Sequence, residues 1–449
     1  MKKIKKLLAL IIVLALAVAT FACAAAEAPG GSFGSGYGGG YVGDLDSEMS
    51  GADDVPEGGE SSKGEAAPDE EPEEKPNDAV RLPSGMITAG AWNDNDNYNM
   101  WLSLFSQGDK EQDLADGKFY RYTVSGNLWG FNSLKRVKVS VTSAGAPVAG
   151  ATVVANDAQN NVLFSAVSDA KGNAYLFVAE NEGTVTVSSG EGSATVAFDA
   201  ENRELSVELD SCGAKLNTIE IMFVVDVTGS MGDEISFLKA ELADVIKKIV
   251  ANDAETIIKL ALLFYRDLDD SVPFDYYDFV DVTKLEGMEA RQGALDKQRA
   301  TGGGDYEEAV DEALLKAVDK QWSTGATTKL IFHVLDAPAH SGKSYEEKFN
   351  KAVVEAAQKG IRICPILCSG AAEVTEYTMR QAAIYTGGTF IFVTDDSGIG
   401  GSHHDPNLPN ITVELLNTML VRLVKGYHTG VFEDPIYWME DPALSTNNE

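Results

Sequence analysis

Three side chains suited to holding a metal ion follow one apolar segment at alternate positions. The run from Ile221 to Val225 has no polar interruption and predicts a strand that is buried on both faces. Asp226, Thr228 and Ser230 come directly after it. One carboxylate and two hydroxyls at a tight, glycine-containing turn form a hard oxygen set that suits Mg²⁺ or another hard divalent ion. The alternative is an ordinary strand-to-helix turn, in which Asp226 or Thr228 caps the next helix.

Two later loops supply further oxygen ligands. The first is ATGGGDYEEA, residues 300–309, where three glycines allow the backbone to approach an ion closely and are followed by Asp305. The second begins at Asp336, the last residue of the apolar segment LIFHVLD. In an open parallel sheet, ligands bind at the carboxyl ends of the strands. We therefore expect the two loops and the Asp226 turn to meet at one edge of a sheet.

The elements that must position these residues alternate between strand and helix from residue 217 to about residue 430. Five segments read as strands: IEIMFVV, IIKLALLF, LIFHVLD, IRICPIL and GTFIFVT. Between them, residues 233–250 and 306–320 carry apolar side chains at helical spacing. This alternation predicts a doubly wound α/β domain.

The motifs DVTGS and TGGGD, followed by a strand-terminal aspartate, resemble the von Willebrand factor A (VWA) domain with its metal-ion-dependent adhesion site. The resemblance covers residues 217–430 and implies a bound divalent cation, Mg²⁺ or alternatively Ca²⁺ or Mn²⁺. Its ligands would be Asp226, Thr228, Ser230, Asp305 and Asp336. Asp305 stands where such domains usually carry a threonine, for which Thr301 is the alternative. A third carboxylate would blunt the attraction of the ion for an acidic partner and widen its tolerance of Ca²⁺ and Mn²⁺.

Residues 136–212 have a different pattern. Seven short segments of alternating polarity, separated by turn clusters, predict a β-sandwich. The stretch AGAPVAGATVVANDAQNN resembles the carboxypeptidase-regulatory-like or transthyretin-like domains of bacterial surface proteins, which implies a spacer or binding module. Residues 81–135 are interpreted as a small N-terminal α/β segment, with a helix that begins near Asp96 and presents Tyr98 and Trp101 on one face.

The start of the chain predicts export. Residues 1–26 contain four lysines, an apolar core and then small residues, which is typical of a signal peptide. Cys23 is a candidate for a lipid anchor, and cleavage after Ala24 or Ala26 is the alternative. Residues 27–80 are rich in Gly, Ser, Pro and acids and predict a disordered acidic linker. Residues 431–449 are interpreted as an acidic C-terminal tail.

Composition limits the classes of partner. The chain of 449 residues has 69 acidic and 36 basic residues, a net charge of −33, which argues against nucleic-acid binding. After export, Cys212, Cys364 and Cys368 remain, too few and too poorly spaced for a disulfide framework. The sequence therefore predicts an extracellular or cell-surface protein that recognises a protein or glycan partner through its cation and has no enzymatic activity.

Two alternatives remain open. The loop APAHSGKS, residues 337–344, matches a loose phosphate-binding loop, but it lacks the first glycine. Nucleotide hydrolysis through Lys343, or service as a subunit beside an ATPase, is the enzymatic alternative. The other is a purely structural surface component whose metal ion stabilises the fold. His340, in the same loop, is expected near the metal site, whereas His333 is interpreted as a core residue.

Overall fold

The structure is a computed structural model that describes residues 85–107, 117–126, 129–233, 235–252 and 255–442. The predicted signal peptide, the acidic linker and the last residues of the C-terminal tail lie outside these ranges. Among the residues described, no helix combines the length and apolarity that a membrane span requires.

The largest sheet in the described part of the chain has eight strands. In spatial order they are β12 (Phe274–Asp281), β11 (Ile257–Tyr265), β10 (Lys215–Asp226), β13 (Ala326–Leu335), β14 (Ile361–Leu367), β15 (Phe390–Val393), β1 (Thr88–Trp92) and β16 (Glu414–Leu415). Strands β11, β10, β13, β14 and β15 run parallel, and β12, β1 and β16 pair antiparallel with their neighbours. The five parallel strands include all five segments predicted from apolar runs.

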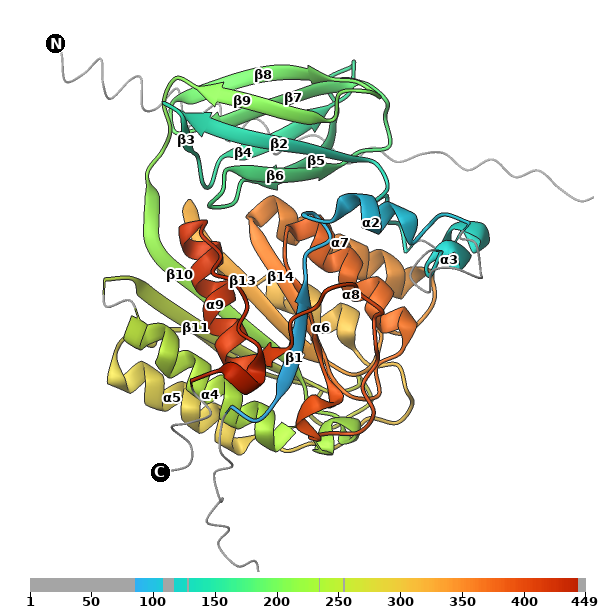
Figure 1. Ribbon diagram of the computed structural model, residues 1–449, viewed down its shortest axis with the longest axis vertical. Helices are drawn as coiled ribbons and strands as arrows, with labels where there is room; N and C mark the ends of the chain where they lie inside the picture. Colours follow the sequence, from blue (N-terminus) through green and yellow to red (C-terminus); the bar gives the residue numbers. More distant parts are fainter. Residues whose placement is uncertain (1–84, 108–116, 127–128, 234, 253–254, 443–449) are drawn as a thin grey trace, which may run out of the picture. The chain divides into compact units, whose positions relative to one another are not determined.

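Helices cover both faces of this sheet (Figure 1). Alternate residues of β10 contribute to two separate cores: Ile221 and Phe223 belong to one, and Met222 and Val224 to the other. The first core contains side chains of α4 (Ile235–Asn252), α5 (Leu285–Lys297) and α9 (Leu416–Thr429). The second contains side chains of α6 (Val310–Val318), α7 (Lys343–Lys359) and α8 (Glu373–Thr386). The mixed α/β architecture predicted for residues 217–430 is confirmed.

Residues 136–209 form two further sheets of four strands each. One contains β3 (Ala146–Pro147), β2 (Arg136–Ser143), β6 (Asn173–Phe177) and β9 (Glu204–Leu209); the other contains β5 (Val162–Val167), β4 (Thr152–Asn156), β7 (Gly183–Ser189) and β8 (Gly192–Phe198). Apart from the two-residue β3, each strand falls on one of the seven segments of alternating polarity. Buried side chains of the two sheets, among them Val139 and Val187, belong to the same core.

The segment that precedes these sheets contributes to the large one. Strand β1 lies between β15 and β16, and the helices α2 (Tyr98–Ser103) and α3 (Tyr120–Ser125) follow it. Glu241 of α4 is fully buried, and its carboxylate accepts hydrogen bonds from the backbone N–H groups of Gly85, Met86 and Ile87 at 2.8 to 3.1 Å. The sequence predicts only a small α/β segment here, and local pattern does not show which sheet a strand joins, so this placement could not be predicted.

Candidate metal site

The carboxyl ends of β10 and β13 bring the first predicted ligands together. The two strands are parallel neighbours, with Val225 opposite Val334, so Asp226 and Asp336 leave the sheet side by side. After β10 the chain continues to β11 on one side, and it later returns to β13 on the other. A reversal of this kind opens a crevice at the carboxyl ends of the strands, which is the usual ligand position in open α/β sheets.

Three oxygen-bearing side chains converge at the turn after β10. Asp226 is fully buried, and its Oδ1 accepts hydrogen bonds from the backbone N–H and the Oγ1 hydroxyl of Thr228, at 2.9 and 2.7 Å. Thr228 Oγ1 lies 3.1 Å from Ser230 Oγ, on the short 3₁₀ helix η1 (Gly229–Asp233). The second carboxylate oxygen of Asp226 is buried and has no hydrogen-bond partner among the residues described. A buried carboxylate oxygen without a donor is the kind of group that a cation stabilises.

Glu308 is a further member of the site that sequence reasoning missed. Only 3% of its surface is exposed, and its Oε2 atom is buried without a hydrogen-bond partner in the described structure. Its backbone N–H donates to the carbonyl of Pro338, which holds the residue beside the loop that leaves β13. A Cβ atom on Gly303 would lie 2.9 Å from Glu308 Oε1, so glycine is required there. The sequence offers only a weak indication of this role: Glu308 lies just before Ala309 and Val310, where the apolar helix α6 begins.

The carboxylates of this site raise one another's proton affinity. Burial, followed by the charge of Asp336, raises the pKa of Asp226 to about 7, although the hydrogen bonds from Thr228 oppose the shift. Burial raises the pKa of Glu308 to about 9, with further contributions from Asp226, Asp267 and other acids. Both shifts have the direction expected when anions are crowded in a low-dielectric environment without a compensating cation. A bound divalent ion would supply the compensating positive charge and lower both pKa values.

The glycine loop is tied to the turn after β10 by backbone hydrogen bonds. Thr301 N–H donates to the carbonyl of Val227, and Gly229 N–H donates to the carbonyl of Gly302. Arg266 donates hydrogen bonds to the backbone carbonyls of Thr301, at 2.9 Å, and of Arg299. Its Nε also contacts the Thr301 hydroxyl at 3.3 Å. Arg266 therefore supports the shape of the loop.

Asp305 lies near His340 and Asp267. Its side chain is 60% exposed, and one carboxylate oxygen lies 3.8 Å from His340 Nε2. The same nitrogen lies 3.8 Å from a carboxylate oxygen of Asp267, in the loop between β11 and β12. Metal-ligand atoms of Asp267, Asp305 and His340 all lie within 4.8 Å of one another. The structure thus brings His340 to the metal loops, as expected, and places Asp305 beside it.

Beneath the site, a histidine is fully buried in β13. His333 Nε2 lies 3.2 Å from the hydroxyl of Tyr265, which is itself fully buried at the end of β11. Burial lowers the pKa of His333 to about 3, so the imidazole is neutral. The interpretation of His333 as a core residue agrees with this environment.

The loop APAHSGKS leads into α7, with Gly342 as the residue before the helix. Lys343 is the first residue of the helix, and its side chain is 88% exposed. Its ammonium lies 3.6 Å from Glu347, one helical turn further on. This geometry is an ordinary surface pair along a helix.

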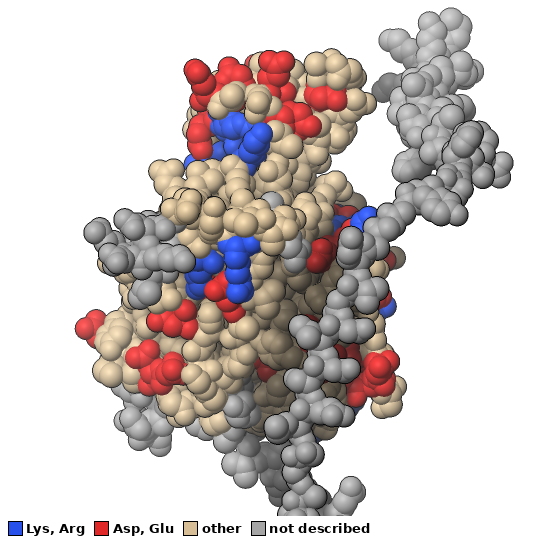
Figure 2. Space-filling model, turned by 90° about the vertical axis from the view of Figure 1, so that its right-hand side faces the viewer, with Lys and Arg blue, Asp and Glu red and all other residues tan. Residues whose placement is uncertain are grey.

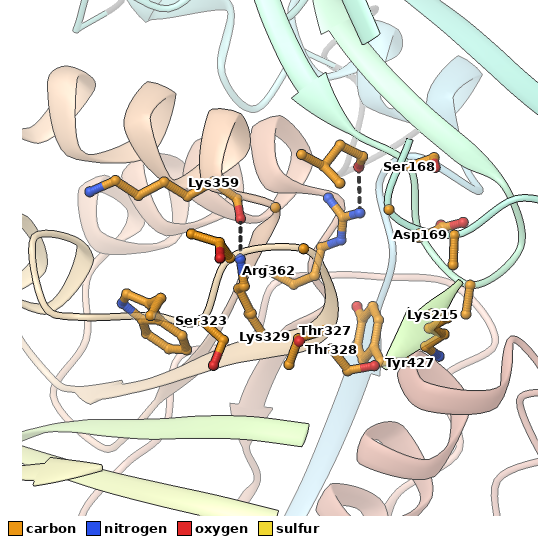
Figure 3. A pocket seen from close by; sticks show the side chains of 18 of the residues that line it. Ser168, Asp169, Lys215, Ser323, Thr327, Thr328, Lys329, Lys359, Arg362 and Tyr427 are labelled. Carbon is orange, nitrogen blue, oxygen red and sulfur yellow. Dashed lines mark hydrogen bonds between the residues drawn. The ribbon is translucent and has the colours of Figure 1, made fainter. Parts of the chain in front are cut away.

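A cavity of about 390 Å³ lies at the opposite ends of the strands, between the amino ends of β13 and β14 and the small sheets (Figure 3). Cationic side chains around the cavity donate hydrogen bonds to backbone carbonyls at the ends of helices. Lys329 Nζ donates to the carbonyl of Lys359, the last residue of α7, at 3.0 Å. Arg362 donates to the carbonyl of Thr386, the last residue of α8, at 2.8 Å, and to that of Val167 in β5 at 2.7 Å. These cations stabilise carbonyls at helix ends, and they do not mark a ligand site.

The surface agrees with the acidic composition. On the face shown in Figure 2, Asp and Glu side chains are distributed over several regions, whereas Lys and Arg gather in a few small groups. No broad basic surface is visible on this face among the residues drawn in colour. Electrostatic attraction to a phosphate backbone has no support from this view.

Fold and site together define a class of protein: an open α/β domain with oxygen-bearing side chains grouped where the central parallel strands end. Residues 220–395 match the family model of the von Willebrand factor A domain. This match covers the strands from β10 to β15 and every residue predicted as a metal ligand. No curated protein matches the chain.

Several solved structures are similar over part of the chain. The conserved hypothetical protein BatB from Bacteroides thetaiotaomicron is 13% identical, over 39% of this chain and 90% of that one, with a TM-score of 0.30. An aerotolerance-related membrane protein from Bacteroides fragilis is 12% identical, over 46% of this chain and 98% of that one, with a TM-score of 0.29. The pilus adhesin SpaC from Lactobacillus rhamnosus GG, in an open conformation, is 11% identical over 56% of this chain, with a TM-score of 0.34. The match spans 32% of the adhesin.

Proposed function

We propose that this chain is a cation-dependent binding protein whose VWA domain recognises a protein or glycan through a bound divalent ion. The proposal rests on one observation. Asp226 and Glu308 are buried at the carboxyl ends of the central strands, and each has a carboxylate oxygen without a hydrogen-bond partner in the described part of the chain. Asp336, also buried, raises the pKa of both. Three acids so placed are stabilised by a cation.

The ligands of this ion would be Asp226, Thr228, Ser230 and Asp336, with Glu308 within the same field of charge. Their oxygens suit Mg²⁺, and Ca²⁺ or Mn²⁺ as alternatives. The exposed position of Ser230 leaves the ion open on one side, where an oxygen of the partner would complete its coordination. No group resembling a nucleophile with its base lies in this set, so the ion would serve in recognition and would break no bond.

The chemistry of the partner follows from the balance of charge. Asp226, Asp336 and Glu308 carry up to three negative charges against two on the ion. An ion whose charge is already offset attracts a carboxylate weakly. Neutral oxygens, such as glycan hydroxyls or amide carbonyls, would therefore compete well with acidic side chains for the open position. Nucleic acid is excluded by the same acidic surroundings.

Location at the cell surface is part of the proposal. The signal sequence at residues 1–26 supports export, and Cys23 offers a lipid anchor to the membrane. Residues 136–209, with their carboxypeptidase-regulatory-like pattern, would act as a spacer or a second binding module. The alternatives are nucleotide hydrolysis, which the exposed Lys343 does not favour, and a structural role for the metal ion alone.

Calorimetric titration of the purified chain with Mg²⁺, Ca²⁺ and Mn²⁺ tests the site, with Asp226→Ala as the variant. We expect saturable binding that weakens at least about a hundredfold in the variant, because both the buried carboxylate and the anchor of Thr228 are lost. Asp157→Ala is the matched control, because the Asp157 carboxylate accepts hydrogen bonds from Gln159 and Asn161 in a turn of the small sheets. Equal binding by wild type and Asp226→Ala would contradict the site.

The recognition step is tested on glycan and protein arrays in Mg²⁺ and in EDTA. Binding that requires Mg²⁺ and is absent in Asp226→Ala would support cation-dependent recognition. Binding that persists in EDTA would assign recognition to another surface. Stabilisation by Mg²⁺ without any cation-dependent partner would favour the structural alternative.

A further inference from the structure

Three loops bring a second set of metal-ligand side chains together beside the first. Asp267 lies in the loop between β11 and β12, Asp305 in the glycine loop and His340 in the loop between β13 and α7. The imidazole Nε2 of His340 lies 3.8 Å from a carboxylate oxygen of each aspartate. The residues are far apart in the sequence, so their meeting depends on how the strands end. Asp267 Oδ1 also accepts a hydrogen bond from the backbone N–H of Leu268 at 2.8 Å, and the His340 ring lies 5.2 Å from that of Tyr345.

The negative charge at this edge exceeds what one divalent ion would neutralise. An ion at Asp226 and Asp336 leaves the charges of Asp267 and Asp305. Glu308 is 3% exposed, has a buried Oε2 without a hydrogen-bond partner among the residues described, and interacts electrostatically with Asp267 and Asp270. Within the described ranges, no lysine or arginine forms an ion pair with Asp267 or Asp305. The nearby Arg266 is turned to backbone carbonyls.

We propose that Asp267, Asp305 and His340 bind a second divalent cation, of the Zn²⁺ class. The ligand set selects the ion. Mg²⁺ and Ca²⁺ take oxygen ligands almost exclusively, whereas imidazole nitrogen suits Zn²⁺ and neighbouring transition metals. The first set contains only oxygens and the second contains a histidine, so the two positions differ in the ion that they prefer.

The distances are close to those of a shared ion. Metal bonds to imidazole nitrogen and carboxylate oxygen are about 2.0 to 2.2 Å, so two ligands of a tetrahedral ion lie roughly 3.3 to 3.6 Å apart. Each contact of His340, at 3.8 Å, is slightly longer than this. The two aspartate oxygens lie within 4.8 Å of each other and would move closer to share the ion. Asp305 is exposed and follows Gly302 and Gly303, which both have positive φ, so its loop can supply that shift.

This assignment changes the role of Asp305. In the sequence-based prediction it is a fifth ligand of the first ion, whereas its neighbours in the structure make it a ligand of the second. Glu308 lies in the electrostatic field of both groups, since Asp226, Asp267 and Asp336 all act on it. A second ion would therefore also help to keep Glu308 ionised. The second site concerns different residues from the proposed recognition site and stands without it.

Cobalt provides the test, because Co²⁺ replaces Zn²⁺ and gives visible absorption that reports nitrogen ligation. The purified full chain is titrated with Co²⁺ in saturating Mg²⁺, which fills the oxygen site, and Zn²⁺ is then added as competitor. We expect one equivalent of Co²⁺ to bind and Zn²⁺ to displace it. His340→Gln and Asp267→Asn should each weaken the binding at least about tenfold. Thermal unfolding of each variant without metal verifies that it folds.

His403→Gln is the matched control, because His403 Nδ1 also pairs with an aspartate, Asp395, at 2.7 Å, but His403 belongs to no cluster of three metal-ligand side chains among the residues described. This variant should bind Co²⁺ as the wild type does. Asp226→Asn should lose Mg²⁺ binding and keep the cobalt absorption, which separates failure of the first site from failure of the second. Absence of Co²⁺ binding in saturating Mg²⁺, or unchanged absorption in His340→Gln, would overturn the proposal. Loss of absorption in both Asp226→Asn and His340→Gln would indicate one shared site and would also overturn it.

Discussion

At Glu308, burial and neighbouring charges act in the same direction. The residue is 3% exposed, and its pKa is raised from 4.5, the ordinary value of a glutamate, to about 9. Without metal, the folded protein therefore keeps this proton while the unfolded chain releases it. Stability is highest below the unfolded pKa and falls as the pH rises toward the folded pKa. Asp226, with a pKa of about 7, adds to the same trend.

We predict that Glu308→Gln stabilises the metal-free chain at high pH. Glutamine keeps the shape of the protonated acid and cannot ionise, so the variant should be more stable than wild type by about 1 kcal/mol or more at about pH 8. Near pH 4 the two should differ little. Urea denaturation in EDTA at both pH values measures this. A difference that is the same at both pH values would show that ionisation of Glu308 is not the cause.

At the scale of elements, basic side chains repeatedly terminate helices. Lys329 binds the end of α7, Arg362 the end of α8, and Lys215 donates to the carbonyl of His428 near the end of α9. Each cation satisfies a carbonyl that has no partner within its own helix and interacts favourably with the negative end of the helix dipole. Arg362 in addition reaches Val167, so it also connects β5 with the large sheet.

We predict that Arg362→Met lowers the free energy of unfolding by about 2 to 4 kcal/mol. The substitution keeps much of the side-chain volume but leaves the carbonyls of Thr386 and Val167 without their charged donor. Arg121→Met is the matched control, because Arg121 is 62% exposed and its pair with Glu373 should contribute less than about 1 kcal/mol. Chemical denaturation of both variants measures the difference. Equal losses would show that the buried contacts of Arg362 are not responsible.

At the scale of the whole molecule, the large sheet is built from distant parts of the chain. Strand β1 pairs with β15 through four residue pairs, from Ala89 opposite Val393 to Trp92 opposite Phe390. Asp94, just after β1, forms a fully buried ion pair with Arg380 of α8, which also pairs with Glu376. Residues 85–94 are therefore part of the α/β core, although the small sheets separate them from it in the sequence.

We predict that a chain beginning at residue 136 folds poorly, whereas one beginning at residue 80 folds normally. The shorter chain exposes the edge of β15 and leaves Arg380 buried with one carboxylate partner fewer, and Glu241 buried without its three donors. Circular dichroism and thermal unfolding of the two chains test this. Similar melting temperatures for the two chains would show that β1 is dispensable for stability and would contradict the prediction.

The strands and helices themselves followed from local pattern. Apolar runs located β10, β11, β13, β14 and β15, and alternating polarity located seven strands of the small sheets, because burial on one or both faces imposes a period that a single segment displays. The order of the metal motifs was also readable, since Asp226 and Asp336 each follow such a run. That these residues bind a cation remains a prediction.

Contacts between segments that are distant in the sequence could be seen only in the folded structure. The sequence alone showed that Asp305 follows three glycines, but the proximity of Asp305 to His340 and Asp267 depends on three loops that lie far apart in the sequence. The burial of Glu308 and the entry of β1 between β15 and β16 are likewise invisible to periodicity. A segment's own residues determine whether it is buried and with what period, whereas its neighbours are determined by the pairing of strands distant in the sequence, which leaves no local signal.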